Sequence, residues 1–132
     1  MIIDTSVLIA ILRRETGFEN YLRFISNASD QFLISSATAL EAHIVVQRFK
    51  LEGLEENLIQ LLDDLGLQIV DFSAAQLAIA IEAHRNFGRG SGHKAQLNFG
   101  DCFAYALAKD RGKPLLFKGN DFTHTDVTRA LP

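Results

Sequence analysis

Short apolar segments alternate along this chain with longer segments of helical spacing. The short segments are IID, FLIS, LQIVDF and PLLFK, at residues 2–4, 32–35, 67–72 and 114–118. Short, continuous apolar runs with polar or turn residues around them are typical of strands buried on both faces of a parallel sheet. We therefore expect a strand at each of these positions.

The segments between the expected strands have helical spacing. They comprise residues 6–15, 20–28, 36–53, 54–66, 73–88 and 101–112. Ser73-Ala-Ala-Gln76 predicts a capping box, in which each polar side chain bonds a free backbone N–H group, and Gly88 and Gly112 are expected helix ends. Strands that alternate with helices predict an α/β fold with a parallel sheet. Ligands of such open sheets bind beyond the carboxyl ends of the strands.

Length and composition indicate the setting of the protein. The chain has 132 residues, of which 48% are hydrophobic and 22% charged, as expected for one globular domain over residues 1–132. A single cysteine, Cys102, excludes an intrachain disulfide and favours a reducing, cytoplasmic location. No run approaches the roughly 18 apolar residues that span a bilayer, and Asp4 interrupts the segment where a signal peptide would be apolar. We expect a soluble cytoplasmic protein without a membrane segment.

The net charge of −3 argues against a broad basic surface for nucleic acid. It does not exclude an enzyme that acts on nucleic acid. Acidic residues around a metal ion lower the net charge, while the metal restores a local positive potential. The positions of the acidic residues therefore matter more than the total charge.

Four acidic residues lie in unusual settings. They are Asp4 at the end of the first expected strand, Glu41 in an apolar helical segment, Asp101 at the start of an apolar helix, and Asp121 just beyond the last strand. Each also has a structural interpretation. Asp4 can cap the following helix, Asp101 can complement the dipole of its own helix, and Asp121 can occupy a turn. Glu41 can lie on the exposed side of an amphipathic helix.

Taken together, the four acids indicate a metal site. Three of them follow strand ends or begin helices that converge on one edge of the sheet, and the fourth can face them. Gathered carboxylates repel one another, so a bare cluster would force some members to bind protons, and a divalent cation removes that cost. Oxygen ligands without a matching set of His and Cys favour Mg²⁺ or Mn²⁺. Such a site suits hydrolysis of phosphodiester bonds by metal-activated water, with one ion or two.

The sequence around these acids resembles the PIN-domain ribonucleases, and most closely the VapC-type toxins of bacterial toxin–antitoxin pairs. The resemblance is carried by MIIDTSVLIAIL, by the ALE glutamate and by NFGDCFAYALAKDRGKPLLFKGNDF, and it extends over essentially the whole chain. It implies a three-layer α/β/α sandwich and an endoribonuclease that depends on Mg²⁺ or Mn²⁺. It also implies a homodimer and inhibition by a small VapB-type antitoxin that inserts near the acidic pocket.

The acidic residues of the family fall on the four positions already singled out. The resemblance implies that Asp4 and Asp101 bind the metal and that Glu41 and Asp121 bind it directly or through water. All four are then expected to be catalytic.

The chain departs from the family pattern at Gly119, where many relatives have a further aspartate. Asp126 either substitutes as an extra acid or lies in the first turn of a terminal helix. The resemblance also suggests that Thr5 or Ser6 forms a hydrogen bond with the site or with a bound water, although both can equally cap a helix. Asn120 has the same two interpretations.

A glycine-rich loop at residues 88–101 contains Arg89, His93 and Lys94. It lacks the spacing of nucleotide-binding loops and does not follow a strand, so we exclude nucleotide binding. The three residues either contact an RNA backbone or belong to a plain solvated loop. Two other functions stay open. One is a non-catalytic binding module with the same fold, and the other is a metal-dependent nuclease or phosphohydrolase with a substrate other than RNA.

Overall fold

A computed structural model describes residues 1–131 as four short strands and six helices. In chain order these are β1 (Ile2–Ile3), α1 (Thr5–Leu12), α2 (Phe18–Asn27), β2 (Leu33–Ser35), α3 (Ser36–Phe49), α4 (Leu54–Asp64), β3 (Gln68–Val70), α5 (Ala74–Phe87), α6 (Asp101–Arg111) and β4 (Leu115–Leu116). Each expected strand and helix is present, and each strand is shorter than its apolar run. Within these residues, no helix has the length and apolar character needed to cross a membrane.

The strands form one parallel sheet in the order β3-β2-β1-β4. Ile2 of β1 pairs with Leu33 of β2 on one side and with Leu115 of β4 on the other, so β1 lies inside the sheet. Parallel strands end at the same edge of a sheet. The residue that follows β1, Asp4, therefore emerges at the carboxyl edge.

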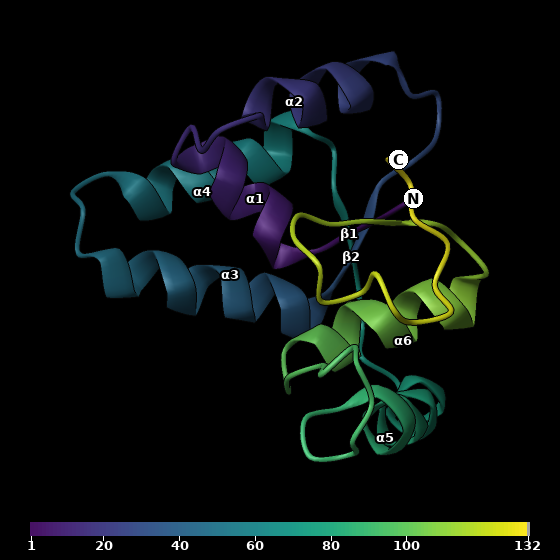
Figure 1. Cartoon of the computed structure of the whole chain (residues 1–132). Coiled ribbons are helices and arrows are strands. Elements are labelled where there is room, and N and C mark those ends of the chain that lie inside the picture. The colour runs from purple at the N-terminus through teal and green to yellow at the C-terminus, as the bar shows by residue number, and fades with distance from the viewer. Residues whose placement is uncertain (132) are drawn as a thin grey trace.

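Helices cover both faces of this sheet and complete a three-layer α/β/α sandwich (Figure 1). Successive residues of a strand point to opposite faces. Ile3 and Ile34 accordingly belong to the apolar core under α1, α2, α3 and α4, whereas Ile2 and Leu33 belong to the core under α5 and α6. The predicted fold class is confirmed.

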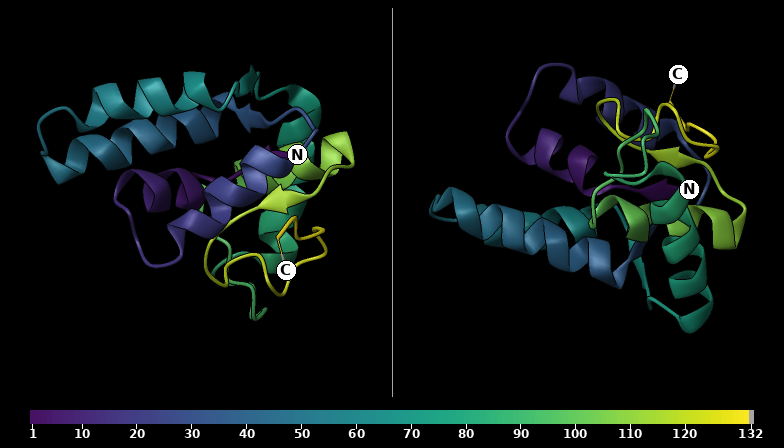
Figure 2. Two further views of the ribbon diagram at one scale, coloured as in Figure 1. Left: turned by 90° about the horizontal axis from the view of Figure 1, so that it is seen from above. Right: turned by 60° about the horizontal axis from the view of Figure 1, so that its bottom comes forward.

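The helices α3 and α4 pack side by side and extend away from the sheet, as Figure 2 shows from two directions. The amino end of α3 follows β2 without a linker, because β2 ends at Ser35 and α3 begins at Ser36. Glu41 lies in the second turn of α3 and therefore stays close to the carboxyl edge of the sheet.

Two details predicted from the sequence are wrong. The strand β3 is not buried on both faces, because within residues 1–131 it pairs only with β2 at the edge of the sheet, and its Ile69 is 55% exposed. The capping box at the start of α5 forms only in part. Ser73 Oγ accepts from Gln76 N at 3.2 Å, but Gln76 Nε2 donates to Asp110 Oδ2 at 3.1 Å, since Gln76 is buried against α6.

Candidate active site

Asp4 follows β1 directly and lies buried at the carboxyl edge of the sheet. Its Oδ2 accepts hydrogen bonds from Ser6 N at 3.0 Å and from Ser6 Oγ at 2.5 Å, so Asp4 caps α1. Burial raises the pKa of Asp4 to about 6, and the charge of Glu41 adds to the rise, although the bonds from Ser6 oppose it. Helix capping and a place in the acidic site therefore coexist at Asp4.

Asp101 is the first residue of α6 and is also buried. Asn98 N donates to Asp101 Oδ2 at 2.8 Å, and Asp101 N donates to Asn98 Oδ1 at 2.9 Å. The pKa of Asp101 is raised to about 7, mainly by burial and in part by the charges of the other three predicted acids. The structure thus brings together the residues that we call the acidic cluster: Asp4, Glu41, Asp101 and Asp121.

Asn98 was not identified from the sequence. Its two hydrogen bonds with Asp101 hold the start of α6 and orient the carboxylate. A short polar residue shortly before a helix is a recognised signal for the helix start, and Asn98 could have been identified by this signal.

Glu41 is held between α1 and the start of α6. Thr5 Oγ1 donates to Glu41 Oε1 at 2.6 Å and lies 3.3 Å from the backbone oxygen of Thr38. On the other side, Glu41 lies against Gly100. A Cβ atom at Gly100 would be only 1.6 Å from Glu41 Oε2, so no larger residue fits while Glu41 keeps this position.

Gly100 was also missed, and no sequence signal identifies it. Its φ of −64° is open to any residue, so backbone conformation does not require glycine. The requirement comes from the close approach of Glu41, which is 59 positions earlier and reaches Gly100 only in the folded chain.

Asp121 is the exposed member of the acidic cluster. The turn after β4 uses Gly119 in the left-handed region, with a φ of 92°, a conformation that favours glycine. Glycine at this position therefore has a conformational role. Asn120 is exposed next to Asp121, and its supporting role stays a prediction.

Asp126 is engaged away from the acidic cluster. Its carboxylate accepts hydrogen bonds from Tyr105 Oη at 2.6 Å and from Lys109 Nζ at 2.9 Å, both on α6. These bonds lower the pKa of Asp126. The chain forms no helix between residues 117 and 131, so placing Asp126 in a terminal helix was wrong.

The three loop residues expected near RNA have different environments. Arg89 and Lys94 are exposed, in a loop closed by a bridge between Gly88 and Leu97. His93 accepts at Nδ1 from Ala95 N at 3.1 Å, and its ring packs edge-on against Phe87 with centroids 5.0 Å apart. His93 therefore stabilises the loop, and contact of the three residues with RNA stays a prediction.

The acidic cluster has the donor chemistry of a site for a hard divalent cation. Within residues 1–131, none of its members forms an ion pair with Lys, Arg or His. Uncompensated carboxylates in a buried setting favour a cation that neutralises them. Among the described residues, the present side-chain positions bring no three Asp, Glu, His or Cys side chains close enough together to hold a metal ion. The residue types therefore fit Mg²⁺ or Mn²⁺, whereas the present arrangement of the side chains does not yet form the site.

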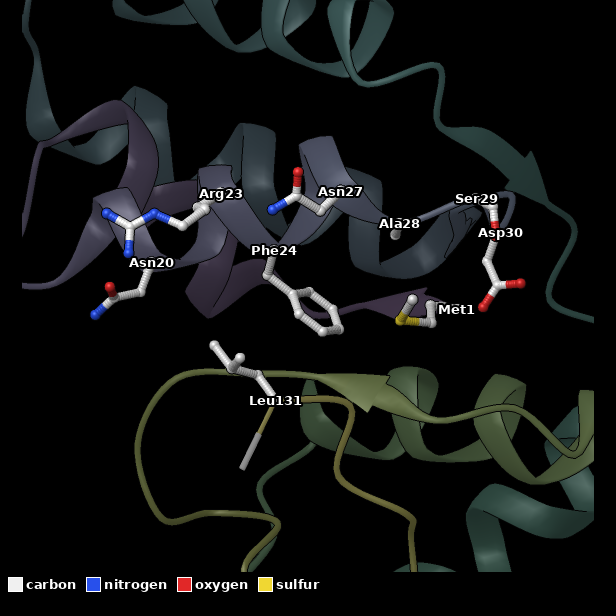
Figure 3. A pocket seen from close by; sticks show the side chains of 9 residues that line it. All are labelled: Met1, Asn20, Arg23, Phe24, Asn27, Ala28, Ser29, Asp30 and Leu131. Carbon is white, nitrogen blue, oxygen red and sulfur yellow. The ribbon is translucent and has the colours of Figure 1, made fainter.

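A cavity of about 680 Å³ lies elsewhere in the molecule, between α2 and the C-terminal segment. Phe24, Leu131 and Met1 lie around it in Figure 3, together with polar residues of α2 and of the loop that follows. Met1 precedes β1, and the acidic cluster lies beyond the other end of that strand. No member of the acidic cluster lines this cavity, so it is separate from the candidate active site.

Comparison with known proteins identifies the family. Residues 1–127 match the family described as PIN domain. Ribonuclease VapC28 of Mycobacterium tuberculosis is 46% identical over 131 residues, which cover 99% of this chain and 98% of the relative. Ribonuclease VapC30 of the same species is 44% identical over 134 residues, which cover 100% of both chains.

Solved structures with low sequence identity have the same fold. VapC20 of Mycobacterium tuberculosis, a Sarcin-Ricin loop cleaving toxin, has a TM-score of 0.79 at 14% identity, over 99% of this chain and 98% of its own. A toxin–antitoxin complex from Klebsiella pneumoniae has a TM-score of 0.70 at 17% identity, over 95% of this chain and 92% of the other. A DNA-bound VapBC from Salmonella typhimurium has a TM-score of 0.71 at 20% identity, over 97% and 93%. Together with the full-length relatives, these results confirm the resemblance: the chain belongs to the PIN-domain family, in the group of the VapC ribonucleases.

Proposed function

We propose that this protein is an endoribonuclease that depends on Mg²⁺ or Mn²⁺ and acts as the toxin of a type II toxin–antitoxin pair. The observation that carries the proposal is the acidic cluster, in which buried Asp4 and Asp101 have no cationic partner among residues 1–131. RNA as the substrate is supported by the relatives, because VapC28 and VapC30 are named ribonucleases.

The chain's own residues hold and orient the carboxylates. Asp4 and Asp101 would bind the cation directly, and the remaining members of the acidic cluster would bind it directly or through water. A bound divalent ion supplies activation of water and stabilises charge on the phosphate oxygens. Ser6 orients Asp4, Asn98 orients Asp101, and Thr5 orients the carboxylate of Glu41.

Substitution of the buried acids tests the proposal. We expect Asp4→Asn and Asp101→Asn to abolish Mn²⁺-dependent cleavage of RNA oligonucleotides and to remove Mn²⁺ binding in calorimetric titration. The folded state should persist, because asparagine has nearly the same shape as aspartate. The matched control is Asp126→Asn, because the carboxylate of Asp126 is bonded to Tyr105 and Lys109 on α6. Cleavage by Asp4→Asn at the wild-type metal-dependent rate would contradict the proposal.

The same assays separate the two other functions that the sequence leaves open. A non-catalytic module would show neither cleavage nor Mn²⁺ binding that depends on these carboxylates. A nuclease for another substrate would cut oligonucleotides in which deoxyribose replaces ribose, because only the 2′-hydroxyl distinguishes RNA at such a site. We expect a single 2′-deoxy series to identify RNA as the substrate.

We also propose a cytoplasmic location and a VapB-type antitoxin as partner. The Klebsiella pneumoniae and Salmonella typhimurium structures support this partner, since they are a toxin–antitoxin complex and a DNA-bound VapBC. A neighbouring reading frame for a small DNA-binding protein would strengthen the toxin role, and co-purification of the two products would test the partnership.

We further propose that the protein is a homodimer. Exposed apolar side chains on α5 and just before α6 support association of this surface with another protein, because contiguous apolar patches are rare on free monomers. Leu77, Ile81 and Phe99 are 48%, 51% and 79% exposed. Sedimentation analysis of wild type and Ile81→Asp would test the oligomeric state, and a wild-type monomer would contradict the proposal.

A further inference from the structure

Lys118 lies beside the acidic cluster but belongs to no part of the proposed metal site. It follows β4 after Phe117, and its backbone N donates to Ser6 Oγ at 3.0 Å. The same Ser6 Oγ donates to Asp4 Oδ2 at 2.5 Å. The backbone of Lys118 is thus connected to Asp4 through one hydroxyl group.

The side chain of Lys118 pairs with Glu15. Lys118 Nζ contacts Glu15 Oε2, and the two side chains are 33% and 32% exposed. Glu15 N donates to the backbone oxygen of Ala10 at 2.9 Å, so Glu15 is held against the end of α1. Arg13 Nη1 lies 3.9 Å from the other oxygen of Glu15. One carboxylate therefore faces two cations, and the group carries a net positive charge.

More positive charge lies at the same end of α1 and α3. The guanidinium of Arg13 lies over the ring of Phe49, 4.1 Å from its centroid, and so joins the end of α1 to the end of α3. Arg14, Arg48 and Lys50 are exposed near these helix ends and form no ion pair within the part of the chain that the structure describes. These cations lie toward the end of α1, whereas the start of α1 is at the carboxyl edge of the sheet.

We propose that Lys118 and Arg13 form a phosphate-binding site for the RNA backbone next to the acidic cluster, and that Glu15 holds the two cations in place when RNA is absent. This inference rests on the proposed ribonuclease function. A polyanion that approaches an acidic cluster needs nearby cations for the phosphates beside the cleaved bond. The flexible stem of lysine lets its ammonium move from Glu15 to a phosphate. Partly exposed ion pairs contribute little to stability, so this exchange of partners costs little.

A binding assay in an inactive background tests the site. The parent is Asp101→Asn, which leaves the contacts of Lys118 intact, and its affinity for single-stranded RNA is measured by fluorescence anisotropy at several salt concentrations. We expect Lys118→Gln to weaken binding by roughly threefold or more and to reduce the salt slope by about 0.7, the value for one phosphate contact. Lys118→Arg should retain most of the affinity. Glu15→Gln should strengthen binding, because it frees both cations.

The matched control is Lys109→Gln. Lys109 is 39% exposed and is also paired with a carboxylate, that of Asp126, so it matches Lys118 in charge, in partial exposure and in having an acidic partner. We expect this variant to bind RNA like the parent. In the active protein, Lys118→Gln should raise KM and leave kcat nearly unchanged.

A merely structural role gives a different pattern. If the Lys118–Glu15 pair only ties the end of α1 to the segment after β4, both Lys118→Gln and Glu15→Gln lower Tm and leave RNA affinity and salt slope at the parent values. That result would overturn the inference while wild-type cleavage upholds the proposed function. If the wild-type protein neither binds nor cuts RNA, the proposed function fails and the inference fails with it.

Discussion

The hydroxyl of Thr5 donates a hydrogen bond to the carboxylate of Glu41, with 2.6 Å between Thr5 Oγ1 and Glu41 Oε1. The two residues lie 36 positions apart, at the start of α1 and in the second turn of α3. Hydrogen bonds to a charged acceptor are short and strong, and they fix the acceptor's orientation. The contact therefore sets the direction in which Glu41 faces the other acids.

Removal of the Thr5 hydroxyl should reduce RNA cleavage. We expect Thr5→Val to lower kcat/KM about 10- to 100-fold, the usual effect of removing a group that orients a metal ligand, because Glu41, a proposed ligand, then loses its partner. Thr5→Ser should retain most of the activity, since it keeps the hydroxyl. The measurement is steady-state cleavage of a fluorogenic RNA. Equal activity of Thr5→Val and wild type would show that the orientation of Glu41 does not matter.

Substitution of Gly100 by alanine should displace Glu41. The added Cβ would lie 1.6 Å from Glu41 Oε2, so the carboxylate must move, whereas the backbone conformation itself tolerates alanine. We expect a loss of activity of about 100-fold, since Glu41 is a proposed catalytic group and a shift of about 1 Å in such a group can have this effect.

A double-mutant cycle isolates the Gly100 effect. In the Glu41→Ala background, Gly100→Ala should cost no further stability, because the clashing carboxylate is gone. Chemical denaturation of the four proteins measures this coupling. A stability loss of the same size in both backgrounds would show that the defect lies in the backbone of the loop.

The stability of the metal-free protein should fall as the pH rises from about 4 to 7. The pKa values of Asp4 and Asp101 are raised to about 6 and about 7 from an ordinary value of 3.8. Between these values the folded state holds more protons than the unfolded state, so the free energy of unfolding decreases with pH. The stabilisation is complete below about pH 4 and is lost as the pH passes the raised pKa values.

Thermal unfolding between pH 4.5 and 8 checks this dependence. We expect a decrease on the order of a few kcal/mol across this range in wild type, a weaker dependence in Asp101→Asn, and recovery of stability at pH 8 when Mn²⁺ is added. The lowered pKa of Asp126 acts only at still lower pH and does not obscure the effect. Identical slopes in wild type and Asp101→Asn would contradict the assignment to Asp101.

Asp126 should matter for stability and not for catalysis. Asp126→Asn weakens the bonds from Tyr105 and Lys109, and we expect a loss of about 1 kcal/mol or less, because the Asp126 side chain is 57% exposed. Tyr105→Phe should have a similar effect, which denaturant titration measures. A loss of Mn²⁺ binding in Asp126→Asn would restore Asp126 as the acid that compensates for Gly119.

Local sequence determined much of the fold. The apolar runs at residues 2–4, 32–35, 67–72 and 114–118 located every strand, because a buried parallel strand needs continuous apolar residues. The burial of β3 could not be predicted, since burial depends on the position of a strand in the sheet. The capping signal at Ser73 was read correctly, but Gln76 faces Asp110, a partner on another helix.

The sequence by itself also indicated which acids to expect at the carboxyl edge of the sheet, and their role in a metal site stays a prediction. Asp4, Asp101 and Asp121 lie at strand ends or helix starts, and parallel topology brings such positions to one edge of the sheet. Only the tertiary structure decided how the acids are held there. The contacts of Glu41 with Thr5 and Gly100, and of Lys118 with Glu15, join residues distant in the chain, and their geometry depends on how α1, α3 and α6 pack together. Local pattern is sufficient to place a residue on an element, whereas a contact between two elements requires both to be folded.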